Sequence, residues 1–253
     1  MQKIFLSVII PCYNEEKNLQ RKVLDEVYKY LSKKDFNFEV IISDDGSTDN
    51  SKEIIEKQIK TLKNFKLLKN EHGGKPSALL SGLKQAKGEW VLFTDMDQST
   101  PIDQLDKLLP FTKYAEVVIG SRGFNRNNFS ILRRIGSVVF LTFRRILILP
   151  EIKDTQCGFK LFKRTDIEKA FPELEFFKTK QRTSGWKVTS YDVELLHILK
   201  INGCKIKEVE VSWHDRDVSN TKGHGSGRYF RESEEMLMQI IRVKMNDMKG
   251  LYS

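Results

Sequence analysis

Three short apolar runs, each followed within a few residues by acidic residues, constrain the fold of this chain more than any other feature. The runs are LSVIIP at 6–11, FEVIISDDGSTD at 38–49 and WVLFTDMDQ at 90–98. The segments between them have the helical spacing of apolar residues, at 18–32, 51–62 and 77–86. Strands that are apolar on both faces and alternate with helices are typical of a mostly parallel sheet covered by helices. The sequence therefore predicts an α/β fold.

The acidic residues of these runs fall where ligands bind in such sheets, beyond the carboxyl ends of the strands. Asp95 and Asp97 leave one strand two positions apart. One or two carboxylates, together with substrate phosphates, are the usual protein ligands of Mg²⁺, and Mn²⁺ also prefers oxygen ligands. The pair therefore predicts a site for Mg²⁺ or Mn²⁺ on a diphosphate. Capping of a helix after Pro101 is an alternative use of the same acids.

Two other motifs are candidates for a nucleotide pocket. Asp44 and Asp45 precede Gly46 and could accept hydrogen bonds from a base and from ribose hydroxyls, which are donors. Tyr13 and Glu15 in PCYNEE would lie at the opposite edge of that pocket. Turns between strand and helix would use the same residue types.

The segment HGGKPSALLSG, residues 72–82, resembles a phosphate-binding loop without its standard spacing. A Walker motif is excluded, because GxxxxGK[ST] is absent. Gly73 and Gly74 could still present backbone N–H groups to a diphosphate, with Lys75 beside them. A plain turn before a helix is the other option.

Composition narrows the class of partner. The 253 residues carry a formal net charge of +9, which predicts an anionic partner. Nucleic acid is not expected as a partner, and a basic nucleic-acid-binding protein stays the remote alternative, because the basic residues form no single long run and no reader motif occurs. The three cysteines lie far apart, so we expect no disulfide framework and a reducing compartment. The first apolar run is interpreted as a strand rather than a signal peptide, and no run approaches the ~20 residues of a membrane helix.

The second half contains two segments with amphipathic spacing. Residues 129–150 pair Arg133 with Arg144 and Arg134 with Arg145 at a spacing that places each pair on one helical face. A basic amphipathic helix on an anionic membrane surface is the favoured prediction, and a core helix the alternative. A final amphipathic helix is expected at 231–248. For it, membrane contact, packing on the domain and homodimerisation all stay open.

In order, PCYNE, DDGST, GGKxxAL, TDMD, GSR, DTQCGFKLF and YDVELL resemble the motifs of the family 2 glycosyltransferases. The similarity spans roughly residues 4–217 and is greatest to the polyprenyl-phosphate (dolichyl-phosphate) sugar synthases. It implies a single domain of GT-A type, a nucleotide-sugar donor, a divalent metal and inversion at the anomeric carbon. The predicted domain spans 1–222, with a nucleotide-sugar half at 1–125 and an acceptor half at 126–222. A C-terminal loop and helix follow at 223–253.

The resemblance also implies roles for individual residues. The expected nucleotide-sugar-binding residues are Pro11, Tyr13, Glu15, Asp44, Asp45, Lys75, Asp95 and Arg122. Asp95 and Asp97 would hold the metal, and Asp97, Asp154 and Asp192 would serve catalysis. Lys160, Arg216 and Lys222 would bind the acceptor phosphate, while Gly158 would flank the reacting sugar and Tyr191 and Glu194 would belong to an acidic acceptor-side motif. Met96 and Gln98 depart from the family pattern, which makes a metal-binding role for Gln98 doubtful.

The implied reaction moves a hexose to a polyprenyl or dolichyl phosphate at the cytosolic face of a membrane, with the enzyme peripheral. UDP-glucose is the favoured donor and GDP-mannose the next. A phosphate monoester has a second pKa of about 6, so this acceptor needs no general base. For a hydroxyl acceptor, Asp192 is the first candidate base and Asp154 the second. A family 2 enzyme acting on a saccharide hydroxyl is therefore the alternative, although the QxxRW motif of processive synthases is absent.

Overall fold

A seven-stranded sheet forms the centre of the computed structural model, which describes residues 3–123, 148–178, 191–219, 238 and 240–252. The strands are β1 (Leu6–Cys12), β2 (Phe38–Asp44), β3 (Phe65–Lys69), β4 (Trp90–Phe93), β5 (Val117–Ser121), β6 (Lys160–Lys163) and β7 (Ile206–Glu210). Their order is β3-β2-β1-β4-β6-β5-β7. Only β6 is antiparallel to its neighbours, β4 and β5. The prediction of a mostly parallel sheet is confirmed.

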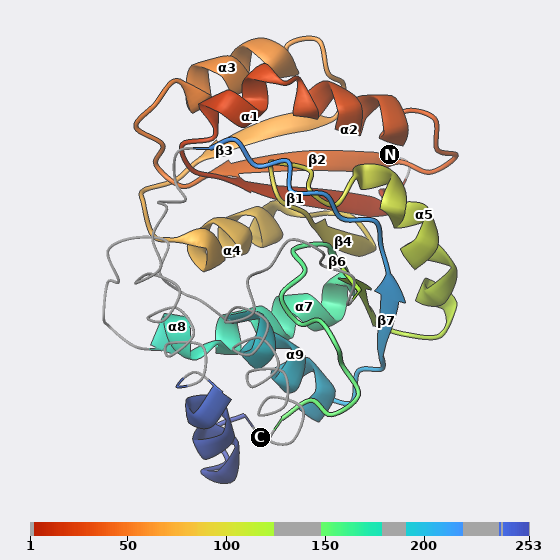
Figure 1. Ribbon diagram of the computed structural model, residues 1–253, viewed down its shortest axis with the longest axis vertical. Helices are drawn as coiled ribbons and strands as arrows, with labels where there is room; N and C mark the ends of the chain where they lie inside the picture. The colour runs from red at the N-terminus through yellow and green to blue at the C-terminus, as the bar shows by residue number, and fades with distance from the viewer. Residues whose placement is uncertain (1–2, 124–147, 179–190, 220–237, 239, 253) are drawn as a thin grey trace, which may run out of the picture.

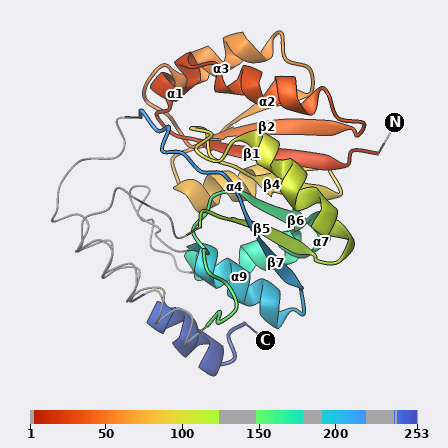
Figure 2. The ribbon, with the colours of Figure 1, turned by 45° about the vertical axis from the view of Figure 1, so that its right-hand side comes forward.

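Helices cover both faces of this sheet (Figure 1 and Figure 2). One face carries α1 (Glu16–Gln20), α2 (Val23–Leu31), α3 (Ser51–Ile59) and α5 (Leu105–Leu108). The other carries α4 (Lys75–Gln85), α7 (Arg164–Ala170), α8 (Glu175–Lys178) and α9 (Tyr191–Ile201). Short 3₁₀ turns lie at Ile102–Gln104, Leu109–Lys113 and Phe171–Glu173.

Alternation along the strands divides the core into two apolar layers. In β1, Ile9 packs toward the layer that contains α4, α7 and α9, whereas Val8 and Ile10 pack toward α1, α2 and α3. Successive side chains of a strand point to opposite faces, so a strand covered on both sides must be apolar throughout. This is why LSVIIP and FEVIIS show no polar alternation.

Several predicted elements differ in the structure. The helix expected at 18–32 is divided into α1 and α2, because Lys22 adopts a left-handed φ of 58°. The predicted basic helix at 129–150 lies outside the described residues except for 148–150, which are not helical. Of the final helix expected at 231–248, residues 238 and 240–248 are described and helical. Across the described ranges, no helix has the length and apolar character needed to cross a bilayer.

Candidate functional site

The site lies at the carboxyl edge of β1, β2 and β4, where three loops meet. Asp44 ends β2 and is fully buried. Its Oδ2 accepts hydrogen bonds from the backbone N–H groups of Gly46, at 3.1 Å, and Ser47, at 3.2 Å. Its Oδ1 is buried without a hydrogen-bond partner in the described part of the chain. A buried acceptor of this kind is costly unless a ligand donor satisfies it.

Asp45, also fully buried, organises the neighbouring loop. Its two carboxylate oxygens accept the N–H groups of Gly73 and Gly74, both at 2.9 Å, and the His72 ring lies 2.9 Å from Oδ2. The Tyr13 ring stacks on His72 with 4.4 Å between centroids. The two glycine N–H groups, considered above for a diphosphate, are thus directed at Asp45. Both oxygens of Asp45 have partners within the protein, and its contact with the nucleotide stays a prediction.

The acidic pair after β4 faces a lysine. Lys75 Nζ donates to Asp95 Oδ1 at 2.5 Å, and the N–H of Ser99 donates to Asp97 Oδ1 at 2.8 Å. Burial lowers the pKa of Lys75, but Asp95 and other nearby carboxylates outweigh this and raise it overall. Lys75 is therefore a fixed positive charge between the nucleotide loops and the rest of the site.

Gln98 turns away from the acidic pair. Its backbone is left-handed, with φ of 51°, and its side-chain N–H groups donate to the Asp95 carbonyl at 2.8 Å and to Thr94. The doubt about a metal-binding role for Gln98 agrees with this orientation. Asp97 accepts an N–H of its own turn, whereas the 3₁₀ turn after Pro101 has no side-chain cap, so the capping alternative is not seen.

Gly158 lets the DTQCGF loop approach the Asp95 carboxylate. A Cβ at Gly158 would lie 2.0 Å from Asp95 Oδ2, far inside van der Waals contact. Any side chain there would push the carboxylate aside. Gly158 therefore fixes where Asp95 can lie.

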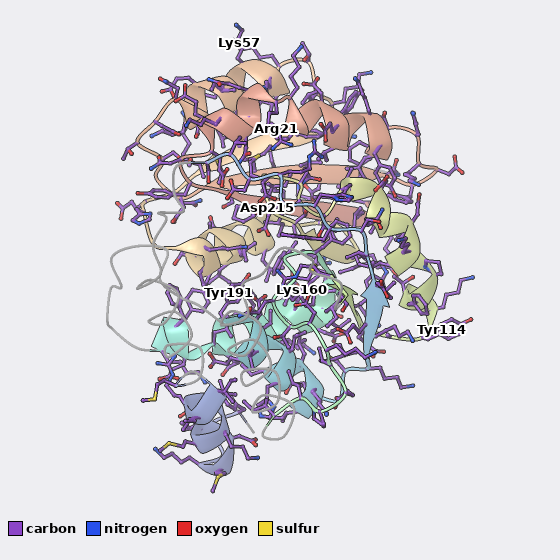
Figure 3. All side chains as sticks on the ribbon, viewed as in Figure 1. Arg21, Lys57, Tyr114, Lys160, Tyr191 and Asp215 are labelled. Atoms are coloured by element: carbon purple, nitrogen blue, oxygen red, sulfur yellow. The ribbon has the colours of Figure 1, made fainter. Side chains whose placement is uncertain are left out.

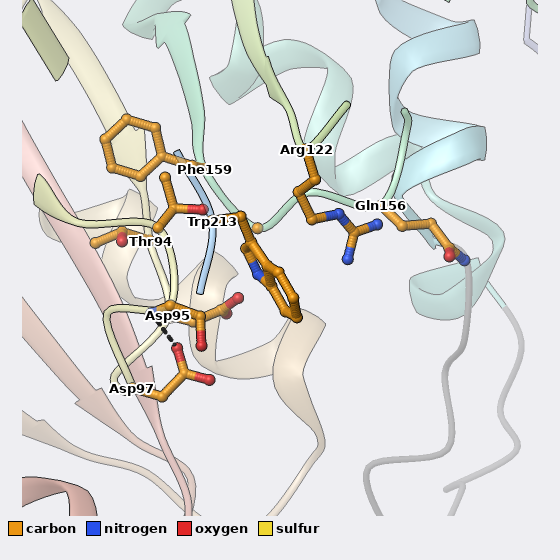
Figure 4. Close-up of a pocket in the computed structure, with 10 residues that line it drawn as sticks. Thr94, Asp95, Asp97, Arg122, Gln156, Phe159 and Trp213 are labelled. Carbon is orange, nitrogen blue, oxygen red and sulfur yellow. Dashed lines mark hydrogen bonds between the residues drawn. The ribbon is translucent and has the colours of Figure 1, made fainter. Parts of the chain in front are cut away.

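The far side of the same pocket is built around a bidentate ion pair. Arg122 donates from Nε to Asp154 Oδ2 at 2.7 Å and from Nη2 to Oδ1 at 2.8 Å. The Trp213 ring lies 5.9 Å from the Arg122 guanidinium carbon (Figure 4). Sequence reasoning missed Trp213, because nothing in its local pattern indicated a return to the sheet edge. The pocket is lined by Thr94, Asp95, Asp97, Ser99, Thr100, Arg122, Gln156, Gly158, Phe159 and Trp213.

Lys160 lies in the protein interior rather than on an open phosphate site. Only 1% of it is exposed, and its Nζ donates to the Cys157 carbonyl at 2.5 Å and to Asp192 Oδ1 at 2.6 Å. Figure 3 shows the contrast between Lys160, inside the fold, and Lys57, which projects from α3. The prediction that Lys160 contacts the acceptor phosphate is not supported by this placement, because Asp192 already neutralises its charge.

Two residues of the YDVELL segment point in different directions. Asp192, in the first turn of α9, faces Lys160, and Tyr191 beside it is buried. Glu194 accepts the Glu175 N–H at 2.8 Å and the Tyr252 hydroxyl at 3.0 Å, so it clamps the C-terminal segment. Neither Asp192 nor Glu194 lines the pocket, and the two carboxylates have different partners.

A strap formed by residues 211–219 crosses the edge of the site. The N–H of His214 donates to the Ser99 carbonyl at 2.8 Å, and Asn18 Nδ2 bridges Glu15 at 2.6 Å and Asp217 at 3.0 Å. Asn18 is fully buried, and nothing in its local sequence beyond its helical position indicated this role. The strap positions Trp213 over the pocket.

Arg216 belongs to this strap but does not face the pocket. Its guanidinium donates to both carboxylate oxygens of Glu26 on α2, at 3.0 and 3.1 Å. The predicted phosphate contact of Arg216 is therefore not seen in this arrangement. Lys222 lies outside the described residues.

Glu15 connects the first strand to the acidic pair. Burial raises the pKa of Glu15 to about 7, with Asp217, Asp97 and Asp95 adding to the effect. The site thus concentrates negative charge on its nucleotide side. Pro11 lies in β1 opposite Ser43 of β2, and its role in nucleotide-sugar binding stays a prediction.

The donor set can be tested against the predicted metal. Across the described ranges, no group of three or more His, Cys, Asp or Glu side chains is arranged to hold a metal ion. Asp95 and Asp97 offer hard oxygen atoms on one short turn at the pocket. Such a pair suits Mg²⁺ or Mn²⁺ that takes its remaining ligands from a diphosphate and water.

Comparisons with known proteins agree with this site. The model of the family "Glycosyl transferase family 2" matches residues 7–171. The chain is 30% identical to dolichyl-phosphate beta-glucosyltransferase of Saccharomyces cerevisiae, over 99% of this chain and 77% of the relative. It is 32% identical to the Homo sapiens protein of the same name, over 82% and 67%.

Solved structures confirm the fold. Glucosyl-3-phosphoglycerate synthase from Mycobacterium tuberculosis, crystallised with Mn²⁺, UDP and glucosyl-3-phosphoglycerate, superposes with a TM-score of 0.61 at 17% identity, over 95% of this chain and 80% of that one. Mannosyl-3-phosphoglycerate synthase from Rubrobacter xylanophilus gives a TM-score of 0.66 at 13% identity, over 98% and 75%. Both are GT-A glycosyltransferases, as the strand motifs implied. The chain is a nucleotide-sugar glycosyltransferase and belongs to glycosyltransferase family 2.

Proposed function

We propose that this enzyme transfers glucose from UDP-glucose to a dolichyl or other polyprenyl phosphate, with inversion at C1 and with Mg²⁺ or Mn²⁺. The names of the curated relatives support this choice of sugar and acceptor. GDP-mannose is the second candidate donor. In this proposal residues 1–125 bind the nucleotide-sugar, residues 126–222 receive the acceptor, and residues 223–253 form a C-terminal extension. The enzyme acts at the cytosolic face of a membrane.

The observation that carries the proposal is the pairing of both candidate bases with cations. Asp154 accepts two hydrogen bonds from the Arg122 guanidinium, and Asp192 accepts one from the Lys160 ammonium group. A general base needs an oxygen directed at the proton it removes. A phosphate monoester is already a dianion near pH 7 and needs no base. An acceptor of this class therefore suits the arrangement better than a saccharide hydroxyl, which is the alternative.

The donor is held in this proposal by the loops after β1 and β2. The orphaned Oδ1 of Asp44 would accept a hydrogen bond from the imide N–H of uracil, and Tyr13 on His72 would provide an aromatic surface beside it. Asp45 acts indirectly, by fixing the loop that carries Lys75. Glu15 would lie toward the ribose.

Charge compensation accounts for the remaining chemistry. A divalent cation on Asp97 and Asp95 would stabilise the negative charge of the leaving diphosphate. Lys75 adds a positive charge beside Asp95, and the Arg122 guanidinium lines the pocket wall, where Asp154 offsets its charge. Gly158 and Trp213 restrict the space in which the acceptor oxygen approaches C1. Positioning and electrostatic stabilisation then supply most of the rate acceleration.

The test is a donor and acceptor screen on the purified chain. UDP-glucose, GDP-mannose and a short polyprenyl phosphate are combined with Mn²⁺, with Mg²⁺ or with EDTA, and lipid-linked sugar is measured. We expect glucosyl lipid from UDP-glucose with either metal and none with EDTA. Transfer to a saccharide hydroxyl but not to the lipid phosphate would establish the alternative.

A further inference from the structure

The C-terminal helix, residues 238 and 240–248, has two different faces. Its inner face is buried against the domain through Ile240 and Val243, both 0% exposed. Asn246 Nδ2 donates to Glu175 at 3.0 Å, and Asp247 lies 3.3 Å from His197 of α9. The helix is therefore firmly packed on α8 and α9, as its position in Figure 1 and Figure 2 also indicates.

Its outer face is a stripe of large apolar side chains. Met238 is 61% exposed, Ile241 39%, Met245 50% and Met248 78%. The spacing i, i+3, i+7, i+10 places these four on one side of a helix. Exposed single apolar residues are ordinary, but a continuous stripe opposite a packed face marks an interaction surface.

The charged residues of the helix are sorted around this stripe. With about 100° between successive residues, Arg242 and Lys249 lie along one border and Lys244 along the other. Lys244 Nζ donates to Asp247 Oδ2 at 3.1 Å. Asp247, the one acid among the described residues of the helix, lies on the inner face beside His197. Arg242 remains half exposed although it pairs with Glu175. An apolar stripe with basic borders is the pattern of a helix that lies in the headgroup region of an anionic membrane.

We propose that the outer face of the C-terminal helix docks the enzyme on an anionic lipid surface. Charge complementarity favours lipid over a second copy of this chain, because two such faces would bring their basic borders together in a protein of net charge +9. The choice of lipid also rests in part on the proposed function, whose acceptor is carried by a membrane. The previously predicted helix at 129–150 is not required for this surface.

The segment that follows the docking helix contacts α9. Tyr252, just after the helix, donates to Glu194 of α9 at 3.0 Å, and Asp192 in the first turn of α9 contacts Lys160. The docking helix is thus packed on the same helix that carries Asp192.

The experiment is co-sedimentation of the full chain with vesicles of phosphatidylcholine, with and without phosphatidylserine. The test variant combines Met238→Gln, Met245→Gln and Met248→Gln. The control is Tyr114→Ser, which alters a 70% exposed aromatic residue on another part of the surface. We expect the test variant to bind anionic vesicles at least about tenfold more weakly and the control to bind as the wild type does. Lys244→Gln with Lys249→Gln should weaken binding only to vesicles that contain phosphatidylserine.

Two further measurements separate the outcomes. Thermal unfolding checks that the variants fold, and light scattering checks their oligomeric state. Equal vesicle binding by the test variant and the wild type overturns the proposal, as does a dimer that only the test variant loses. Turnover of a water-soluble short-chain polyprenyl phosphate should be unchanged in the test variant. Absence of turnover in the wild type counts against the proposed function and leaves the vesicle result intact.

Discussion

The nucleotide side and the acceptor side of the pocket stabilise their carboxylates in different ways. On the nucleotide side, Asp44 and Asp45 accept hydrogen bonds from backbone N–H groups of the protein's own loops. On the acceptor side, Asp154 and Asp192 are paired with Arg122 and Lys160. Backbone donors hold a carboxylate in place without cancelling its charge, whereas a cationic side chain does both.

This difference indicates where a cation would bind. The acceptor side is close to electrically balanced, but the nucleotide side retains its negative charge. Asp95, which pairs with Lys75, also lies against Gly158 of the acceptor side. A metal ion is therefore expected at Asp95 and Asp97.

The largest effect is expected at the acidic pair. Asp97→Asn keeps an oxygen for the Ser99 N–H but loses the charge that would bind the metal. We expect kcat for glucosyl transfer to fall at least about a thousandfold, with little change in thermal stability. Asp103→Asn, at an exposed position nearby, is the control and should keep wild-type activity. Wild-type activity in Asp97→Asn would show that the nucleotide side does not use the charge of Asp97 to bind a metal ion.

Next in size is the ion pair on the acceptor side. Asp154→Asn leaves the guanidinium of Arg122 without a charged partner in a site where both side chains are largely buried. Urea unfolding should show a loss of about 3 kcal/mol in the free energy of unfolding. Lys3→Gln, which breaks an exposed pair with Glu89, should cost at most about 0.5 kcal/mol. Equal losses of unfolding free energy in the two variants would show that the Arg122–Asp154 pair contributes no more to stability than an exposed ion pair.

Gly158→Ala tests the contact between the two sides. The added Cβ must displace the Asp95 carboxylate, so we expect activity to fall about a hundredfold. Stability should change less, because that carboxylate is 41% exposed and can move into solvent. In an Asp95→Ala background the same substitution should cause no further loss. An additive loss there would show that Gly158 acts through another contact.

The smallest effect concerns pH. Because the pKa of Glu15 is raised from 4.5 to about 7 in the folded state, that state binds its proton more tightly than the unfolded chain does. The free energy of unfolding should therefore fall as pH rises from 4.5 to 7, by on the order of 2 kcal/mol from this group. Urea unfolding across this pH range should show that the Glu15→Gln variant lacks this fall in the free energy of unfolding. A curve that keeps its slope in the variant would assign the loss to other groups.

Much of the fold could be predicted from local pattern. Doubly apolar strands such as 6–11 require cover on both faces, and acids at their ends mark the ligand edge. The antiparallel insertion of β6 between β4 and β5 could not be predicted, because strand order depends on contacts between segments that are distant in the sequence. Contacts of the same kind bring Trp213 and Asn18 to the site.

The sequence by itself determined the residue types and their order: the acids at strand ends, the basic excess and the family. Only the tertiary structure decided which partner each charge meets. Lys160 and Arg216 are cations in a promising motif and loop, yet Asp192 and Glu26 take up their charge. Glu194 follows Asp192 by two positions and therefore lies on another face of α9, where it clamps Tyr252. Charge pairing depends on distances of a few ångströms, and these are set by packing between elements that are far apart in the chain.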